Sequence, residues 1–116
     1  MQNSETIFDK ILSGAIPAKK VLENDFCLAF HDISPQAPIH VLIIPKTKLK
    51  NISEATSEHV PVLGRILEMA GLVAHHLKVI DSGYRLIINN GRDAGQSVDY
   101  IHCHLLAGRP LCFPIA

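Results

Sequence analysis

Residues 99–109, DYIHCHLLAGR, carry two histidines two positions apart within an apolar stretch, His102 and His104. Side chains on a strand alternate between faces, so these two would share one face with Tyr100, at roughly 7 Å from each other at the backbone. Two imidazoles at that separation can contact one phosphate or one metal ion. The residues of the opposite face are apolar and are expected in the core: Ile101, Cys103 and Leu105.

Two other interpretations of the histidine pair must be weighed. The two side chains can simply be partly exposed residues on the open face of an antiparallel sheet. Alternatively His40, at the start of HVLIIP, can add a third ligand and complete a zinc site. Against zinc, no carboxylate or cysteine stands at ligand spacing, and Cys103 is expected to face away. We therefore expect neither a metal nor another cofactor.

The segment NNGRDAGQS, residues 89–97, precedes the histidines. Its glycines allow the backbone to approach an anion closely with N–H groups exposed. Ser97 and Asn89 can add neutral hydrogen-bond donors. A glycine-bearing turn followed by a histidine strand suggests a phosphate held beside a nucleophile.

Apolar runs on both sides of this turn predict the strands that position the histidines. FCLAFHD and IHVLIIP are β-branched or aromatic runs separated by the two prolines of ISPQAP, which cannot continue a ladder. The later strands are predicted in YRLIINN and YIHCHLL. The four predicted strands span residues 26–32, 39–45, 84–90 and 100–106.

Helical periodicity occurs in two segments. In residues 5–14 an apolar stripe ends at Gly14, a plausible helix stop. A long helix is predicted from Ser57, as N-cap, to Leu77, with Pro61 in its first turn. The apolar stripe of the long helix comprises Val60, Leu63, Leu67, Ala70, Ala74 and Leu77. Strands before and after one long helix, with short connections, indicate an α+β fold with an antiparallel sheet.

The composition fits one domain spanning residues 1–116, of which 47% are hydrophobic. The 11 acidic and 11 basic residues balance, so we expect no nucleic-acid partner and no anionic membrane surface. Three cysteines without CxxC spacing are typical of reduced thiols, two of them buried, in a cytoplasmic protein. No apolar run reaches membrane-spanning length.

Three segments carry a resemblance to a known family: TIFDKILSGAIPAKKV, DISPQAPIHVLIIPK and GYRLIINNGRDAGQSVDYIHCHLLAGRP. Together they resemble the histidine-triad (HIT) nucleotide-binding proteins over nearly the whole chain. The resemblance implies an antiparallel sheet of about five strands with one long and one short helix. It also implies a homodimer in which the sheet continues across the interface, and a purine nucleoside monophosphate or phosphoramidate as ligand.

The resemblance assigns roles by position. His102 would be the nucleophile of a phosphoramidate hydrolase, supported by His104 and His40, with Ser97 as a further catalytic group. Asp32 would bind the ribose hydroxyls beside an apolar base pocket. The residues expected to contact the nucleotide are Asp32, Ile33, Asn89, Gly95, Gln96, Ser97, Val98, His102 and His104.

This chain departs from the family pattern at three positions. Tyr100 stands where the first histidine of the triad belongs, Asp99 where a tyrosine is common, and Phe113 where relatives often have tryptophan. Phe113 is expected to affect which substrate is selected, and Tyr100 is expected to affect the catalytic rate. The expected function is cleavage of nucleoside 5′-phosphoramidates through a nucleotidyl-histidine, slowed by Tyr100. The alternative is a nucleotide- or partner-binding protein with little or no turnover.

The chemistry sets one requirement on the nucleophile. A histidine attacks phosphorus only when it is neutral, with one ring nitrogen free and the other held as N–H by an acceptor. A backbone carbonyl can be that acceptor, and Tyr100 in place of histidine leaves it present. If the first triad position only shapes the pocket, Tyr100→His should change little. If that position helps to deliver a proton to the departing amine, a phenol does so reluctantly, the protein should be slow, and Tyr100→His should raise turnover.

Overall fold

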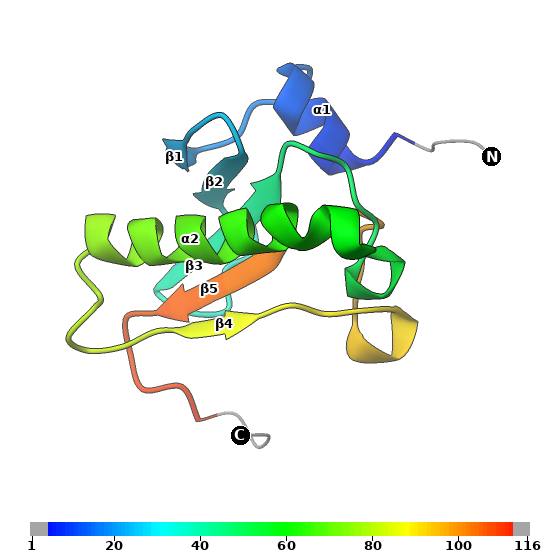
Figure 1. Cartoon of the computed structure of the whole chain (residues 1–116). Coiled ribbons are helices and arrows are strands. Elements are labelled where there is room, and N and C mark those ends of the chain that lie inside the picture. Colours follow the sequence, from blue (N-terminus) through cyan, green and yellow to red (C-terminus); the bar gives the residue numbers. More distant parts are fainter. Residues whose placement is uncertain (1–4, 113–116) are drawn as a thin grey trace.

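The computed structural model describes residues 5–112, which form two α-helices and one five-stranded sheet (Figure 1). The helices are α1 (Ile7–Ser13) and α2 (Val60–His76). The strands are β1 (Lys20–Glu23), β2 (Cys27–His31), β3 (Ile39–Pro45), β4 (Arg85–Ile87) and β5 (Cys103–Ala107). Short 3-10 turns span Ile52–Glu54, Ser57–His59 and Arg92–Ala94. The expected α+β fold is confirmed, and Phe113 lies outside the described residues.

All strand pairs are antiparallel, in the order β1-β2-β3-β5-β4. The central strand β3 matches the prediction for residues 39–45, and β2 lies within the predicted 26–32. In the β3–β5 ladder, Leu42 is opposite His104 and His40 is opposite Leu106. His40 is therefore a diagonal neighbour of His104, on the same face of the sheet. The ladder thus brings together two histidines that are 64 residues apart in sequence.

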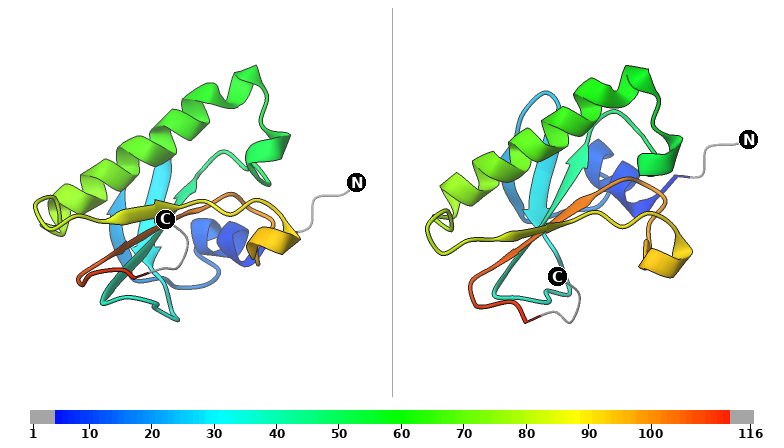
Figure 2. Two further views of the ribbon diagram at one scale, coloured as in Figure 1. Left: turned by 90° about the horizontal axis from the view of Figure 1, so that it is seen from below. Right: turned by 60° about the horizontal axis from the view of Figure 1, so that its bottom comes forward.

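The helices cover opposite faces of the sheet (Figure 2). On the α2 side, Ile101, Cys103 and Leu105 are buried with helix residues, as the alternation of side chains predicts. On the other side, Tyr100 is buried with α1. Cys27 and Cys103 are buried free thiols, which confirms the expectation of two buried cysteines.

Helix α1 is defined at both ends by local hydrogen bonds. The Thr6 side chain accepts from the Asp9 N–H, and the Asp9 carboxylate accepts from the Thr6 N–H, which is a reciprocal capping box. Gly14 ends the helix in the left-handed conformation, with φ 85°, as predicted. Phe8 and Ile11 are buried against the sheet and line the cavity described below.

The long helix is confirmed, but its start and its buried stripe differ from the prediction. Thr56, not Ser57, is the capping residue, and it caps the 3-10 turn that precedes α2. Its hydroxyl accepts a hydrogen bond from a backbone N–H of that turn, and the His59 side chain accepts one from the Thr56 N–H. The predicted stripe residues Val60 and Leu67 are 63% and 54% exposed. Ala70 and Ala74 of the predicted stripe are buried, and Leu63 and Leu77 pack against the core. Ile66, Met69 and Val73 complete the buried face of the helix.

The two later strands are shorter than their apolar runs. Strand β4 contains only three residues, and β5 begins at Cys103, so Tyr100 lies in a bend and His102 in the irregular segment just before the ladder. No strand was predicted for the residues that form β1. The four residues of β1 mix polar and apolar side chains, and their pairing with β2 contains a register irregularity. No helix within residues 5–112 has the length and apolar character needed to cross a lipid bilayer.

Candidate active site

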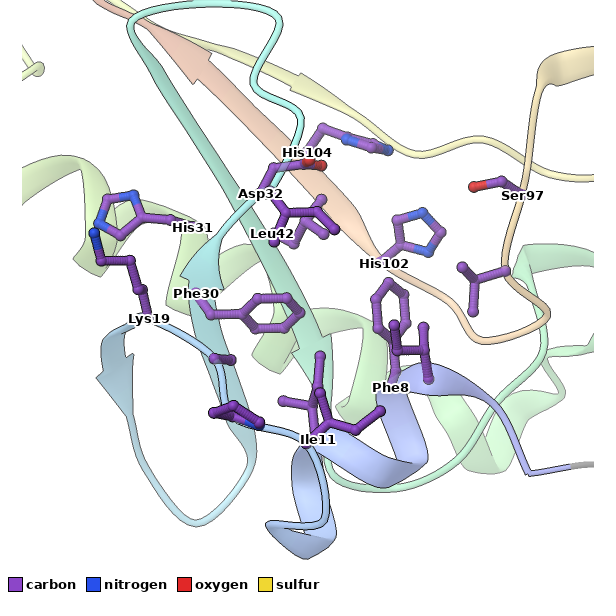
Figure 3. Close-up of a pocket in the computed structure, with 16 residues that line it drawn as sticks. Phe8, Ile11, Lys19, Phe30, His31, Asp32, Leu42, Ser97, His102 and His104 are labelled. Atoms are coloured by element: carbon purple, nitrogen blue, oxygen red, sulfur yellow. The ribbon is translucent and has the colours of Figure 1, made fainter.

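A cavity of about 600 Å³ lies between α1 and the sheet, within the range of small-ligand pockets. Its floor is apolar: Phe8, Ile11, Phe30 and Leu42 line it. Figure 3 shows Ser97 and His102 at one end of this cavity and Lys19 and His31 at the other, with Asp32 between them. The cavity can thus accept an elongated ligand that is apolar along much of its length.

His102 is held in one orientation by its own backbone. Its Nδ1 lies 2.7 Å from the carbonyl oxygen of Tyr100, which can only accept, so Nδ1 carries the proton and Nε2 keeps its lone pair. The ring is 5% exposed and meets the edge of Phe8 with centroids 5.0 Å apart. Burial lowers the pKa of His102 despite opposing contributions from this hydrogen bond and from Asp32. The requirement for a neutral nucleophile with a backbone acceptor is met.

The hydrogen bonds of His40 determine which ring nitrogen of His104 carries the proton. The N–H of Gln36 donates to Nδ1 of His40 at 3.0 Å, so the proton of the neutral His40 ring must be on Nε2. That Nε2 lies 2.9 Å from Nδ1 of His104, which therefore accepts. The neutral His104 ring then carries its proton on Nε2. Burial lowers the pKa of His40, opposed by the charge of Asp32.

His104 is consequently a neutral hydrogen-bond donor beside His102. The two ring centroids are 5.0 Å apart. Burial, together with His102 and His40, lowers the pKa of His104 to about 4. His104 therefore stays uncharged at neutral pH and can donate a hydrogen bond to an anion in the cavity.

Asp32 combines a structural contact with a position on the cavity. Its Oδ1 accepts from the N–H of Ser34 at 2.7 Å, which closes the turn after β2, while Oδ2 lies 3.5 Å from Nε2 of His40. The side chain is 17% exposed and lines the cavity. Ile33, 93% exposed, stands at the rim. One carboxylate oxygen thus holds the turn while the other lies beside His40, and the residue as a whole lines the cavity.

The glycine-bearing turn contributes two of its expected contact residues to the cavity, Ser97 and Val98. Gln96 instead braces the turn: its side-chain oxygen accepts from the Gly91 N–H, and its side-chain nitrogen donates to the carbonyls of Lys50 and Val98. Gly95 ends the 3-10 turn with φ 87°, a conformation that favours glycine. Asn89 and Gly95 are not among the residues that line the cavity, so their contacts with a nucleotide stay predictions.

The sequence profile of the HIT domain matches residues 13–111 of this chain. The protein belongs to the histidine-triad family. This HIT protein is 47% identical over 107 residues to the purine nucleoside phosphoramidase of Escherichia coli, covering 92% of this chain and 90% of that one. It is 50% identical over 110 residues to an uncharacterized HIT-like protein of Synechocystis, covering 95% and 96%.

Solved structures agree with this assignment. A HIT family hydrolase from Legionella pneumophila superposes with a TM-score of 0.91 at 42% identity, covering 95% of this chain and 98% of that one. A HIT family hydrolase from Clostridium thermocellum gives a TM-score of 0.93 at 37% identity, covering 99% and 100%. The resemblance noted in the sequence is therefore confirmed, and the five-stranded sheet with two helices is the HIT fold.

In this HIT protein, Tyr100 occupies the first triad position but does not line the cavity. Its side chain is 1% exposed, and its hydroxyl donates to the carbonyl oxygen of Pro45. Phe8 packs edge-on against the ring with centroids 6.0 Å apart. Burial raises the pKa of the phenol further above its ordinary value. The Tyr100 hydroxyl is therefore not placed to exchange a proton with a ligand in the cavity, and whether a histidine at this position would deliver one stays a prediction.

Three potential metal ligands do meet in this HIT protein, because the fold places the Asp32 carboxylate beside His40 and His104. Their nearest ligand atoms lie within 4.8 Å of one another, which corrects the expectation that no carboxylate stands near the histidines. The hydrogen bonds of His40 argue against a metal ion bound by these three residues. Nδ1 of His40 accepts from the Gln36 N–H, so Nε2 is protonated and cannot ligate unless that bond breaks. The donor set fits a hydrogen-bonded chain better than a cation.

Proposed function

We propose that this protein is a hydrolase that cleaves the P–N bond of purine nucleoside 5′-phosphoramidates through a nucleotidyl intermediate on His102. The observation that carries the proposal is the hydrogen bond from Nδ1 of His102 to the Tyr100 carbonyl, which leaves an unprotonated Nε2 on a ligand-sized cavity. The name of the E. coli relative, purine nucleoside phosphoramidase, supports the choice of substrate.

The cavity suggests a way for a nucleotide to bind. A phosphate beside His102 and Ser97 leaves the ribose hydroxyls within reach of Asp32, where a carboxylate accepts charge-assisted hydrogen bonds. The purine ring then lies on the apolar floor, between α1 and Phe30, with Ile33 at the rim. The Nε2–H of His104 and the Ser97 hydroxyl are available to the phosphoryl oxygens.

The reaction would proceed in two displacements. Nε2 of His102 forms a bond to phosphorus as the P–N bond breaks, and the departing nitrogen takes a proton from solvent water and leaves as the amine. Water then attacks phosphorus and gives up a proton to solvent, the P–Nε2 bond breaks, and the nucleoside monophosphate is released. The hydrogen bond from His104 and the one from Ser97 stabilise charge on the non-bridging oxygens in both steps. The Tyr100 carbonyl stabilises the positive charge that His102 acquires in the intermediate.

The alternative function is nucleotide or partner binding with little turnover. Tyr100 at the first triad position is the feature that favours it. The retained orientation of His102 and the neutral donor His104 favour catalysis. Incubation with adenosine 5′-phosphoramidate, followed by quantification of AMP, decides between the two. Denaturing quench and mass spectrometry then detect a nucleotidyl adduct, which the binding-only alternative does not produce.

Removing the Asp32 carboxylate is expected to weaken nucleotide binding. Asp32→Ala should cost about 1.5–3 kcal/mol of AMP binding free energy, the usual range for a hydrogen bond to a charged group. Calorimetric titration with AMP measures it. Asp32→Asn serves as a matched variant, because an amide oxygen can still accept from the Ser34 N–H and preserve the turn. Reduced stability with unchanged affinity in Asp32→Ala would show that the residue only closes the turn.

We further propose a two-fold homodimer whose sheet continues across β4. Strand β4 is at the sheet edge, and large apolar side chains on α2 and β4 are exposed, among them Leu67 at 54% and Leu86 at 37%. A C2 pair is the commonest closed assembly that buries such a surface. Light scattering at micromolar concentration should give the mass of two chains.

Leu86→Lys should shift that equilibrium toward the monomer, because it places a charge on the proposed interface. Phe26→Lys is the matched control: Phe26 is 45% exposed but lies at the turn between β1 and β2, away from the β4 edge. A monomeric natural protein, or equal effects of the two substitutions, contradicts the proposed dimer.

A further inference from the structure

The peptide group between Tyr100 and Ile101 is hydrogen-bonded on both sides. Its N–H, on Ile101, donates to the carbonyl of Leu49 at 2.7 Å. Its carbonyl, on Tyr100, accepts from Nδ1 of His102 at 2.7 Å. Hydrogen bonds in such a chain polarise one another, so the bond to Leu49 strengthens the acceptor that His102 uses. The orientation of this one peptide therefore decides where the imidazole proton is held.

This peptide is not fixed by the sheet, because the β5 ladder begins only at Cys103. The Tyr100 side chain supplies an anchor instead. Its ring is 1% exposed and packs among Phe8 and the other residues of the α1-side core. Its hydroxyl donates to the carbonyl of Pro45, the last residue of the central strand β3. The phenol thus ties the peptide to the most enclosed strand of the fold.

We propose that Tyr100 is a positioning residue: its phenol, bound to the Pro45 carbonyl, aligns the peptide whose oxygen holds the Nδ1–H of His102. Hydrogen-bond strength falls steeply with misalignment. When the peptide tilts, the imidazole proton can move to Nε2, where it occupies the lone pair that attacks phosphorus. Tyrosine at the first triad position then supports the nucleophile from the core and does not take part in proton transfer.

Tyr100→Phe tests this inference, which rests on the proposed role of His102. The substitution keeps the ring and removes only the hydroxyl. We expect kcat for adenosine 5′-phosphoramidate to fall about tenfold with KM within about twofold, as for a group that orients without binding substrate. In 15N NMR spectra, the Nε2 signal of His102, assigned by its loss in His102→Ala, should shift toward the protonated value. Tyr84→Phe, at the only other tyrosine, which is 37% exposed, should change neither quantity.

The outcomes separate positioning from mere stability. A Tyr100→Phe variant with a lower unfolding temperature but an unchanged Nε2 signal and kcat overturns the proposal. So does faster turnover in Tyr100→His, since an imidazole is too short to reach the Pro45 carbonyl and should therefore slow the reaction. If the natural protein releases no AMP, the proposed function fails, and the 15N comparison of Tyr100→Phe with Tyr84→Phe still decides whether Tyr100 positions the ring.

Discussion

His102→Ala is expected to reduce phosphoramidate turnover by about 10⁴-fold or more, because it removes the atom that forms the bond to phosphorus. AMP binding should stay within about tenfold of the natural protein, since Asp32, Ser97 and the apolar floor remain. Product formation and AMP titration, measured on the same preparation, give the two quantities. The nucleotidyl adduct seen by mass spectrometry after a denaturing quench should disappear in the variant.

His75→Ala is the matched control, because His75 is exposed in the last turn of α2, on the opposite face of the sheet from the cavity. It should keep full turnover. If His102→Ala keeps the activity of the natural protein, another group is the nucleophile. If AMP affinity and phosphoramidate turnover are both lost in His102→Ala, then His102 acts by binding the ligand or by stabilising the fold.

Acidification is expected to destabilise the protein between about pH 6.5 and pH 4, before most carboxylates titrate. The folded pKa values of His40, His102 and His104 are lowered, so the unfolded chain binds protons more readily than the folded one. Stability is therefore fully present above the unfolded histidine value and is lost as the pH falls toward the folded values. For His104 alone, a pKa change from 6.5 to about 4 corresponds to about 3 kcal/mol.

Urea unfolding at pH 7.5, 6.5, 5.5 and 4.5 measures this loss. His104→Gln replaces the titrating ring by a neutral amide, so its unfolding free energy should decline less over the same interval. His76→Gln, at an exposed position of α2, should leave the decline unchanged. Equal pH dependence in all three proteins would mean that the buried histidines are not the groups responsible.

The same buried histidines should also set the acid limb of activity. Protonation of His102 at Nε2 removes the lone pair, and because burial lowers its pKa, turnover should persist below the ordinary histidine range. The three rings are in contact, so they titrate together and the acid limb should report pKa values of the group rather than of one ring.

Period-two alternation was sufficient to place the histidine pair. It put Ile101, Cys103 and Leu105 in the core and left His102 on the opposite face, and both assignments hold in the structure. It also identified residues 39–45 as a strand, from which His40 reaches His104. These features can be predicted from the local sequence because each depends on whether an individual side chain is apolar and is therefore buried.

Contacts between distant segments could not be read from the sequence. The Tyr100 hydroxyl donates to the carbonyl of Pro45, which is 55 residues away in sequence. This contact depends on how β3 lies against the segment just before β5, which is outside the ladder. Nothing in the sequence indicated that the Gln96 side chain hydrogen-bonds the Gly91 N–H and the carbonyls of Lys50 and Val98. Phe8 and Ile11 belong to the apolar stripe predicted in residues 5–14, but their place in the cavity beside Phe30 required knowing which face of the sheet α1 covers.

Cys103 shows what this arrangement means for covalent inhibitors. The thiol lies between two site histidines in sequence, yet it faces the α2-side core and is fully buried. Burial raises its pKa to about 11, so very little thiolate is present near neutral pH. Maleimides, iodoacetamide and peroxide should therefore modify Cys112, which is exposed, and spare the buried Cys103. An electrophile aimed at this enzyme must target imidazole, and its catalysis should survive oxidative conditions that disable thiol-dependent hydrolases.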